Sequence, residues 1–528
     1  MKIKTNIFRI SLVLILAAAG ILCVYAVSND HSNAAPNQNI AAPRNSQPVD
    51  RNQQPEMTNK TPRGQSPERN AIQRPFEPSG GRVGGGNTGG GTDYAPQLIA
   101  YSVIFLGLFM AAYYLITYKK LEVHPGNEKI LILTILCLGL LLRVSSATLM
   151  DGHPFDLSLF RNWATAAAHN LFQVYAASRS IDYPPLYMYV LYLIGKLAGI
   201  TALSPYFTLL LKLPSIVADI ATSFLIYKLA RKYLSAEISV LAASFYVFNP
   251  AVLINSTFWG QVDSFFTLIV TAAIFLLAEK KTGLAAALFA AAVLMKPQGI
   301  IFLPVLFFEL VRQKNLKSFA SAAAIALSTA VLIVLPFALS QGAMWIFQLF
   351  SDTLAKYPYA SVNAFNFFSL LGANYTRDIS TLFLFSYHSW GMIFIVMITI
   401  FSWLIYIKGN SRLFIAAAAL LQIAGVFTFS SRIHERYLFP AVALSILAFI
   451  YLKDKRLLLL SAGFSATVYM NTHYILYWTS KGVHAAPYSP ALVITSLLNM
   501  LLFGYLVKVL YDIAITKKNI PVTQQQTT

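Results

Sequence analysis

The sequence contains little charge and almost no cysteine. Only 12% of its 528 residues are charged, and Asp and Glu together number 21. The two cysteines, Cys23 and Cys137, lie in separate apolar segments, so neither a disulfide framework nor a cysteine-based metal site is expected. A nucleotide-binding phosphate loop is not visible either, because the glycine-rich run at 80–91 lacks the strand, the helix and the lysine that such a loop requires.

Apolar residues, in contrast, make up 56% of the chain. They form continuous runs, many of which approach or exceed the about 18 to 20 residues that span a bilayer. Continuous runs disfavour a β-barrel, whose strands alternate over about ten residues. The net charge of +19 comes from short Lys and Arg clusters between these runs, a pattern that indicates membrane topology rather than nucleic-acid binding. The sequence therefore predicts an all-α polytopic membrane protein in a lipid bilayer, without a nucleic-acid partner.

Composition also divides the chain into segments. The apolar run near the N-terminus is typical of a transmembrane helix or of a secretory signal, and only a partial cleavage pattern, at Val24 to Ala26, favours a retained helix. The Asn-, Gln-, Pro- and Gly-rich stretch that follows is predicted to be a disordered external linker. The expected segments are the N-terminal helix at 1–27, the linker at 28–94, an extra transmembrane helix and cytoplasmic loop at 95–128, a membrane domain at 129–515 and a cytoplasmic tail at 516–528.

The basic clusters predict the topology of the membrane domain. If Lys119, Lys120 and Lys129 are cytoplasmic, the long polar segment at 150–189 is external. Later clusters, from Lys228 to Lys518, leave room for two helices between neighbours, so all of them can be cytoplasmic. This pattern predicts a bundle of roughly 12 to 14 transmembrane helices in the cell membrane, at about 20 residues each. The short aromatic segment at 186–200 is then expected to be an external interfacial helix.

The external loops contain nearly all the remaining polar chemistry. A few carboxylates accompany Arg, Lys and His at a boundary between water and lipid, which suits an anionic lipid headgroup and a hydroxylated acceptor. The candidate site residues are Asp151, Asp156, Asp182, Tyr183, Gln261, Asp263, Lys296, Gln298, Asn363, Arg432, His434 and Arg436.

Several short motifs in these loops resemble a known family. They are Asp156 after a helix, Asp182-Tyr183-Pro184-Pro185-Leu186, Asn249-Pro250, Trp259-Gly260-Gln261-Val262-Asp263-Ser264, Lys296-Pro297-Gln298, Asn363-Ala364-Phe365-Asn366 and His434-Glu435-Arg436-Tyr437-Leu438. Their order and shared external placement resemble the GT-C superfamily of polyprenyl-phosphate-sugar glycosyltransferases. The resemblance extends over 130–512 and is nearest to the bacterial branch related to the second mannosyltransferase of GPI-anchor assembly.

The resemblance implies an inverting transfer of a hexose, with mannose expected, from a polyprenyl-phosphate donor to a hydroxyl of a glycan, lipid or protein acceptor. Asp156 would be the general base, with Asp151 in reserve, although many relatives carry their acidic pair adjacent or one residue apart. The donor phosphate would contact Arg432, His434, Arg436 and Lys296. The remaining candidates, Asp182, Tyr183, Gln261, Asp263, Gln298 and Asn363, would bind substrate. No cofactor is expected; the sequence leaves open whether a divalent metal takes part, but nothing in it supports one.

Each assignment has a structural alternative. Asp156 and Asp263 are also suited to cap the helices that follow them, and Asp182 to fix a turn. Lys296 can extend to the membrane surface, and the cluster at 434–436 can be an interfacial charge network. At the level of function, the alternative is a lipid-linked sugar flippase or a solute transporter. Transporters place polar residues near the bilayer midplane in both halves, whereas the charges here gather on one face, which favours an enzyme.

Overall fold

The computed structural model describes residues 5–29, 94–178, 180–342 and 344–516. The linker expected at 28–94 and the tail expected at 516–528 therefore lie almost entirely outside the described residues. The described chain forms the α-helices α1 (Thr5–Ser28), α2 (Ala95–Thr117), α3 (Pro125–Ala147), α4 (Pro154–His169), α5 (Val174–Ala177), α6 (Leu186–Ala198), α7 (Phe207–Tyr233), α8 (Ala236–Val247), α9 (Pro250–Leu253), α10 (Asp263–Ala278), α11 (Thr282–Met295), α12 (Leu303–Gln313), α13 (Leu316–Ala338), α14 (Trp345–Ala355), α15 (Phe367–Leu370), α16 (Tyr387–Gly409), α17 (Ile415–Phe429), α18 (Pro440–Leu452), α19 (Lys455–Ser480) and α20 (Pro490–Tyr511).

Short elements connect these helices. A two-stranded antiparallel hairpin consists of β1 (Thr381–Leu382) and β2 (Phe385–Ser386). Four short segments are 3-10 helices: η1 (Leu171–Gln173), η2 (Ser204–Tyr206), η4 (Pro297–Phe302) and η5 (Arg412–Phe414). Two are π-helices: η3 (Ile254–Trp259) and η6 (Asp512–Thr516).

The described residues confirm an all-α polytopic membrane protein. By length and composition, nine of their helices can cross a bilayer. Four further apolar helices, α6, α10, α11 and α18, have only 10 to 17 residues. Long apolar segments become helices because a helix satisfies every backbone hydrogen bond within the segment. A total of 12 to 14 spans requires some of the shorter helices as well.

The core includes residues of many helices, and α17 and α18 lie within it with almost all of their residues buried. Buried ion pairs join the helices around it. Arg143 of α3 donates to Asp219 of α7 at 3.1 Å, and neither side chain is exposed. Lys212 of α7 instead donates to the carbonyls of Ala147 and Met150, at 2.9 and 2.5 Å. Asp219 is therefore a scaffold residue that joins α7 to α3 through its ion pair with Arg143.

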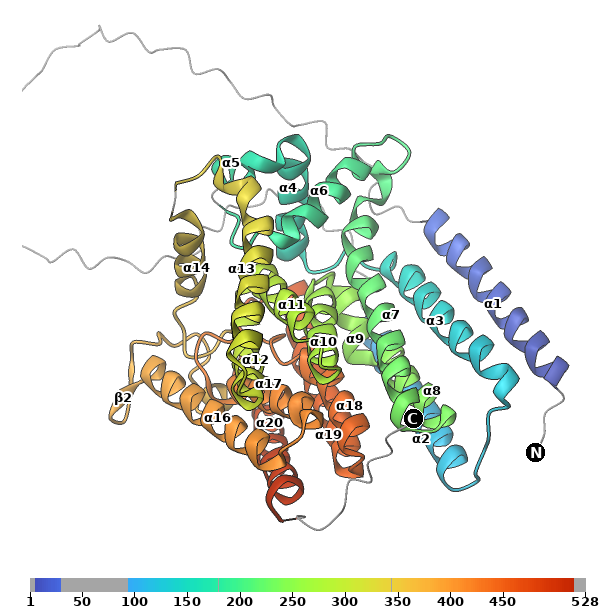
Figure 1. The fold of residues 1–528 in the computed structure, drawn as a ribbon. Coiled ribbons are helices and arrows are strands. Elements are labelled where there is room, and N and C mark those ends of the chain that lie inside the picture. The colour runs from blue at the N-terminus through green and yellow to red at the C-terminus, as the bar shows by residue number, and fades with distance from the viewer. Residues whose placement is uncertain (1–4, 30–93, 179, 343, 517–528) are drawn as a thin grey trace, which may run out of the picture. The chain divides into compact units, whose positions relative to one another are not determined.

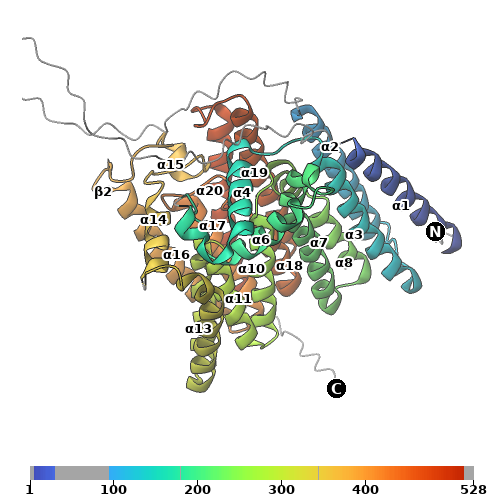
Figure 2. The same cartoon turned by 90° about the horizontal axis from the view of Figure 1, so that it is seen from above.

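Three short helices, α4, α5 and α6, lie together at one end of the long helices (Figure 1). Figure 1 shows α4, α5 and α6 at the top of the view, above α7, α10 and α11. Seen from above, α4 and α6 lie between α1 and α3 on one side and α14 and α16 on the other (Figure 2). The two helices pack on each other, and Gly195 of α6 lies so close to the carbonyl of Ala164 that a Cβ there would meet its oxygen at 2.1 Å. The polar segment at 150–189 is thus anchored over the bundle.

Candidate active site

Two glycines with left-handed backbone bring the start of α4 against the end of η3. Gly152 has a φ of +100° and Gly260 a φ of +81°, a region that favours glycine. An added Cβ would meet Leu157 at 2.4 Å from the first and at 2.9 Å from the second. The amide of His153 donates to the carbonyl of Trp259 at 2.9 Å. The close approach of these backbones places Asp156 beside Trp259.

Asp156 lies in the first turn of α4, and its carboxylate is held by several donors. Helix α4 begins at Pro154, and its cap is His153, whose ring accepts from the amide of Asp156 at 3.3 Å. The alternative that Asp156 caps a helix beginning at Leu157 is therefore wrong. The Asp156 Oδ2 accepts from Trp259 Nε1 and from Gln261 Nε2, each at 2.6 Å, and lies 3.4 Å from Arg436 Nη1.

These contacts control the ionisation of Asp156. Burial raises the pKa of its carboxyl, but the charges of Arg436 and His153 and the hydrogen bonds from Trp259 and Gln261 lower it to about 2. Asp156 is therefore ionised at neutral pH. As a base in this state it is weak, because a general base works best with a pKa near the operating pH.

Arg436 joins two carboxylates and an aromatic ring. Its Nε donates to Glu435 at 3.0 Å, and its guanidinium carbon lies 4.8 Å from the centre of the Trp259 ring. His153 stacks on the same ring at 4.6 Å, with an angle of 5° between the planes. Burial raises the pKa of Glu435 above its ordinary value, although Arg436 opposes this shift. The arrangement fixes one guanidinium between Asp156 and Glu435.

A second buried pair lies beside this cluster. Lys296 donates to Asp263, and their side chains are only 6% and 2% exposed. Asp263 begins α10 without a capping hydrogen bond and accepts from Asn255 at 3.2 Å, so the capping alternative does not describe it. The ammonium of Lys296 lies 5.7 Å from the ring of Tyr183 and 5.8 Å from that of Tyr437. Lys296 is thus enclosed in the protein rather than extended to a membrane surface.

The other predicted residues have different surroundings. Arg432 donates to the buried Asp378 at 2.6 Å, and Asp182 accepts from Lys356 at the same distance. Gln298 donates to the carbonyl of Tyr437 at 2.8 Å. Asp151 is exposed. The structure therefore brings together Asp156, Tyr183, Gln261, Asp263, Lys296, His434 and Arg436. It places Asp182, Gln298 and Arg432 in other contacts and leaves Asp151 exposed.

Asn363 supports the loops instead of facing the cluster. Its backbone is left-handed, with a φ of +58°. Its side chain donates to the carbonyl of His484 at 2.8 Å and accepts from the amide of Ala486 at 2.9 Å. A backbone bridge joins it to His434. Asn363 thus holds the loop that carries His434 to Arg436, which leaves little of its side chain for substrate.

Sequence reasoning missed several partners in this cluster. Glu435 belongs to the motif at 434–438 but is not one of the predicted site residues, although a buried Arg436 requires a carboxylate partner. Asn255 lies eight residues before Asp263, and nothing in this spacing predicts that their side chains form a hydrogen bond. His153 carried the clearest signal, because it stands directly before Pro154, where helix caps are expected. Within the described residues, no group of three or more His, Cys, Asp or Glu could hold a metal ion.

His434 is expected to make the stability of the protein depend on pH. Burial and the charges of Arg436 and Lys296 lower the pKa of its imidazole from 6.5 to about 3. Between these values the unfolded chain binds a proton that the folded protein does not, so stability is lost as the pH falls from about 6.5 toward 3, at up to about 1.4 kcal/mol per pH unit. The melting temperature in detergent should therefore drop between pH 7 and 5, and drop less in His434→Gln.

The exposed His169 supplies the control for this experiment. His169→Gln should retain the full pH dependence of the wild type. Equal slopes for wild type and His434→Gln would show that the imidazole of His434 does not titrate as its surroundings predict.

Part of the chain is similar to a known protein family. Residues 182–339 match the family model described as dolichyl-phosphate-mannose-protein mannosyltransferase. No curated protein matches the chain. The matched range includes Tyr183, Gln261, Asp263 and Lys296, and ends before Arg436. The match supports the resemblance to the GT-C superfamily and indicates a membrane glycosyltransferase that uses a lipid-linked sugar.

Proposed function

We propose that this protein transfers mannose from a polyprenyl-phosphate donor to an acceptor hydroxyl, with inversion, on the external face of the cell membrane. The observation that carries the proposal is the partly buried contact between Asp156 and Arg436, next to the buried Lys296. A base and two cations lie together within loops that border the membrane helices. The acceptor oxygen would attack the anomeric carbon while its proton passes to Asp156 and the polyprenyl phosphate leaves with the bonding electrons of the broken C–O bond.

Donor binding would also activate the base. The donor phosphate would compete with Asp156 for the guanidinium of Arg436, because Arg forms bidentate contacts with phosphate. An anion beside Asp156, and a weaker contact to Arg436, both disfavour the ionised carboxylate and raise its pKa. The pKa would thus move from about 2 toward the range in which a carboxylate accepts a proton effectively.

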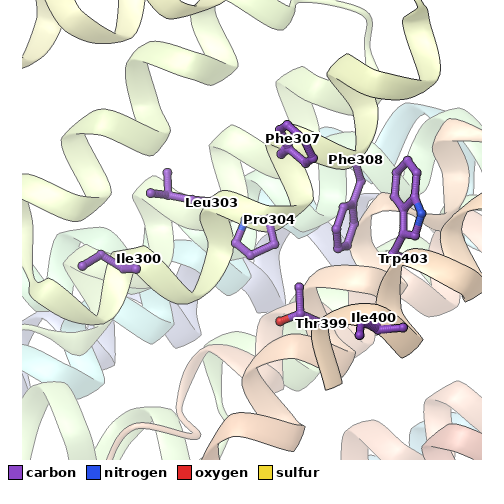
Figure 3. A pocket seen from close by; sticks show the side chains of 8 residues that line it. All are labelled: Ile300, Leu303, Pro304, Phe307, Phe308, Thr399, Ile400 and Trp403. Carbon is purple, nitrogen blue, oxygen red and sulfur yellow. The ribbon is translucent and has the colours of Figure 1, made fainter. Parts of the chain in front are cut away.

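An apolar pocket is positioned to hold the isoprenoid chain of such a donor. It has a volume of about 540 Å³ and lies between η4 and α12 on one side and α16 on the other. Figure 3 shows Ile300, Leu303 and Pro304 along one wall and Thr399, Ile400 and Trp403 along the other. Ile300, in η4, lines this pocket and follows Lys296 by four positions in the sequence. A chain in this pocket would leave its phosphate near Lys296.

The direct test is an assay of the purified protein in lipid nanodiscs with polyprenyl-phosphate mannose and, separately, polyprenyl-phosphate glucose. We expect release of polyprenyl phosphate from the mannose donor, with a higher kcat/KM than from the glucose donor. A higher kcat/KM with the glucose donor would mean that the transferred sugar is glucose instead of mannose. If the protein bound the donor and moved it across the membrane without cleaving it, its function would be that of a flippase instead of an enzyme.

Arg436 and Arg432 are expected to differ in their effect on donor binding. Arg436→Lys keeps the charge but loses the fork of donors, so the donor affinity should fall about tenfold or more, as expected for lost contacts to a charged group. Arg432→Lys is the matched control, because Arg432 is engaged with Asp378. Donor Kd values from titration would decide, and an equal loss in both variants would place Arg432 at the phosphate as well.

The external location of the site predicts how engineered cysteines are labelled. Ser158 is exposed two positions after Asp156, and Lys281 is exposed between α10 and α11. A membrane-impermeant maleimide should label Ser158→Cys in intact cells and Lys281→Cys only after permeabilisation. The wild type, with Cys23 and Cys137, gives the background signal. The reverse pattern would place the site on the cytoplasmic face.

A further inference from the structure

A polar pocket separate from the apolar one lies between the loop before α6 and the helix α14. Its volume is about 610 Å³. Figure 1 shows α5 and α14 on the same side of the described chain. The pocket is lined by Tyr175, Ala176, Ser178, Ser180, Ile181, Asp182, Gln341, Trp345, Gln348, Leu349, Asp352, Thr353 and Lys356.

An ion pair in this pocket consists of two residues, each of which directly precedes in the sequence a tyrosine that contacts the candidate active site. Asp182 and Lys356 are paired at 2.6 Å. Asp182 precedes Tyr183, whose ring lies 5.7 Å from the ammonium of Lys296. Lys356 precedes Tyr357, whose ring meets that of His434 edge-on at 4.7 Å. A molecule held in the pocket would therefore lie next to the cluster around Asp156 and Lys296.

The pocket combines aromatic faces with uncharged hydrogen-bonding groups. The rings of Tyr175 and Trp345 lie 5.0 Å apart at an angle of 49°. Gln341 and Gln348 contribute amides. The Nε2 atom of Gln341 is buried and has no hydrogen-bond partner among the described residues. A buried donor without a partner is costly, and a ligand oxygen would satisfy it.

The charge of the described lining disfavours an anion. Lys356 is already neutralised by Asp182. Asp352 is exposed at the pocket and has no ion pair within the described residues, so the described lining carries a net negative charge. A carboxylate accepts hydrogen bonds from hydroxyl groups and repels a phosphate. The donor phosphate would thus be directed to Arg436 and Lys296, away from this pocket.

We propose that this pocket binds the acceptor, and that the acceptor is a neutral, hydroxyl-rich glycan. The identification as an acceptor rests on the proposed transfer reaction, whereas glycan binding itself does not. Sugars suit the lining because their apolar faces pack on aromatic rings and their hydroxyls both donate and accept hydrogen bonds. One way to recognise an extended peptide is to add it to a strand edge, and none of the described lining residues lies in a strand.

The test measures binding of mannobiose, a neutral disaccharide, to the full-length protein by saturation-transfer NMR without any donor. We expect binding by the wild type and an affinity about tenfold weaker in Asp352→Asn, the loss expected for one hydrogen bond to a charged group. Gln348→Ala should weaken binding less. Both side chains are exposed, so neither change threatens the fold.

The matched control is Glu122→Gln, which removes an exposed carboxylate between α2 and α3 and should leave mannobiose binding unchanged. Mannobiose phosphate should bind more weakly than mannobiose. Absence of mannobiose binding, equal binding by all variants, tighter binding of the phosphate, or displacement by a neutral Ser- and Thr-rich peptide would each overturn the proposal. A separate titration with polyprenyl-phosphate mannose tests the proposed enzyme, so a protein that binds mannobiose but no donor would refute only the reaction.

Discussion

Asp156→Asn is expected to lower the rate of sugar transfer by about 10² or more, the typical contribution of a general base. Asparagine keeps the shape of the side chain and can still accept from Trp259, but it cannot take the proton of the acceptor hydroxyl. The donor should bind equally well or more tightly, because Arg436 would lose one of the two carboxylates that compete with a phosphate. Single-turnover rates and donor Kd values, measured separately, would distinguish the two effects.

Two variants complete this experiment. Asp151→Asn tests the reserve candidate, and we expect little loss because Asp151 is exposed and makes none of the contacts that hold Asp156. Asp512→Asn removes a carboxylate that pairs with Arg456, far along the chain from the candidate site, and should behave as the wild type. If Asp156→Asn lost donor binding but kept its chemical rate, Asp156 would position the donor. The base would then be sought at Glu435, whose pKa is raised by burial.

Lys296→Met is expected to destabilise the protein strongly, by about 3–5 kcal/mol, because it leaves the carboxylate of Asp263 buried without its cation. Asn255 would remain as a hydrogen-bond donor but supplies no charge. The melting temperature in detergent measures this loss. Lys356→Met provides the matched control, since the Asp182–Lys356 pair is partly exposed and such pairs contribute only about 0–1 kcal/mol.

The double variant Lys296→Met with Asp263→Asn separates the structural role of Lys296 from its role in donor binding. Removing both charges abolishes the unpaired carboxylate, so most of the lost stability should return. The donor affinity should remain low, because no ammonium is left to contact the phosphate. Recovery of both stability and donor affinity would mean that Lys296 acts only as the partner of Asp263.

The sequence by itself determined the class of the protein and the segments that become helices. Runs such as the one that forms α13 contain too few polar groups to be stable except as a membrane helix, whose backbone hydrogen bonds lie within the segment. The break at Lys296 and Pro297 was visible as well, because proline follows the last residues of α11 and disfavours helix in the residue before it. Both inferences depend on short-range properties of the chain.

Only the tertiary structure decided which charges meet. Asp156 and Arg436 are separated by 280 positions, and Lys296, at the end of α11, is paired with Asp263 at the start of α10. Arg432 lies four residues before Arg436 and yet pairs with Asp378. Motifs identified the loops and most of the residue types of the candidate site, but not these partners. The physical reason is that a partner depends on where packed helices place their ends, and that position results from contacts across the whole bundle rather than from local sequence.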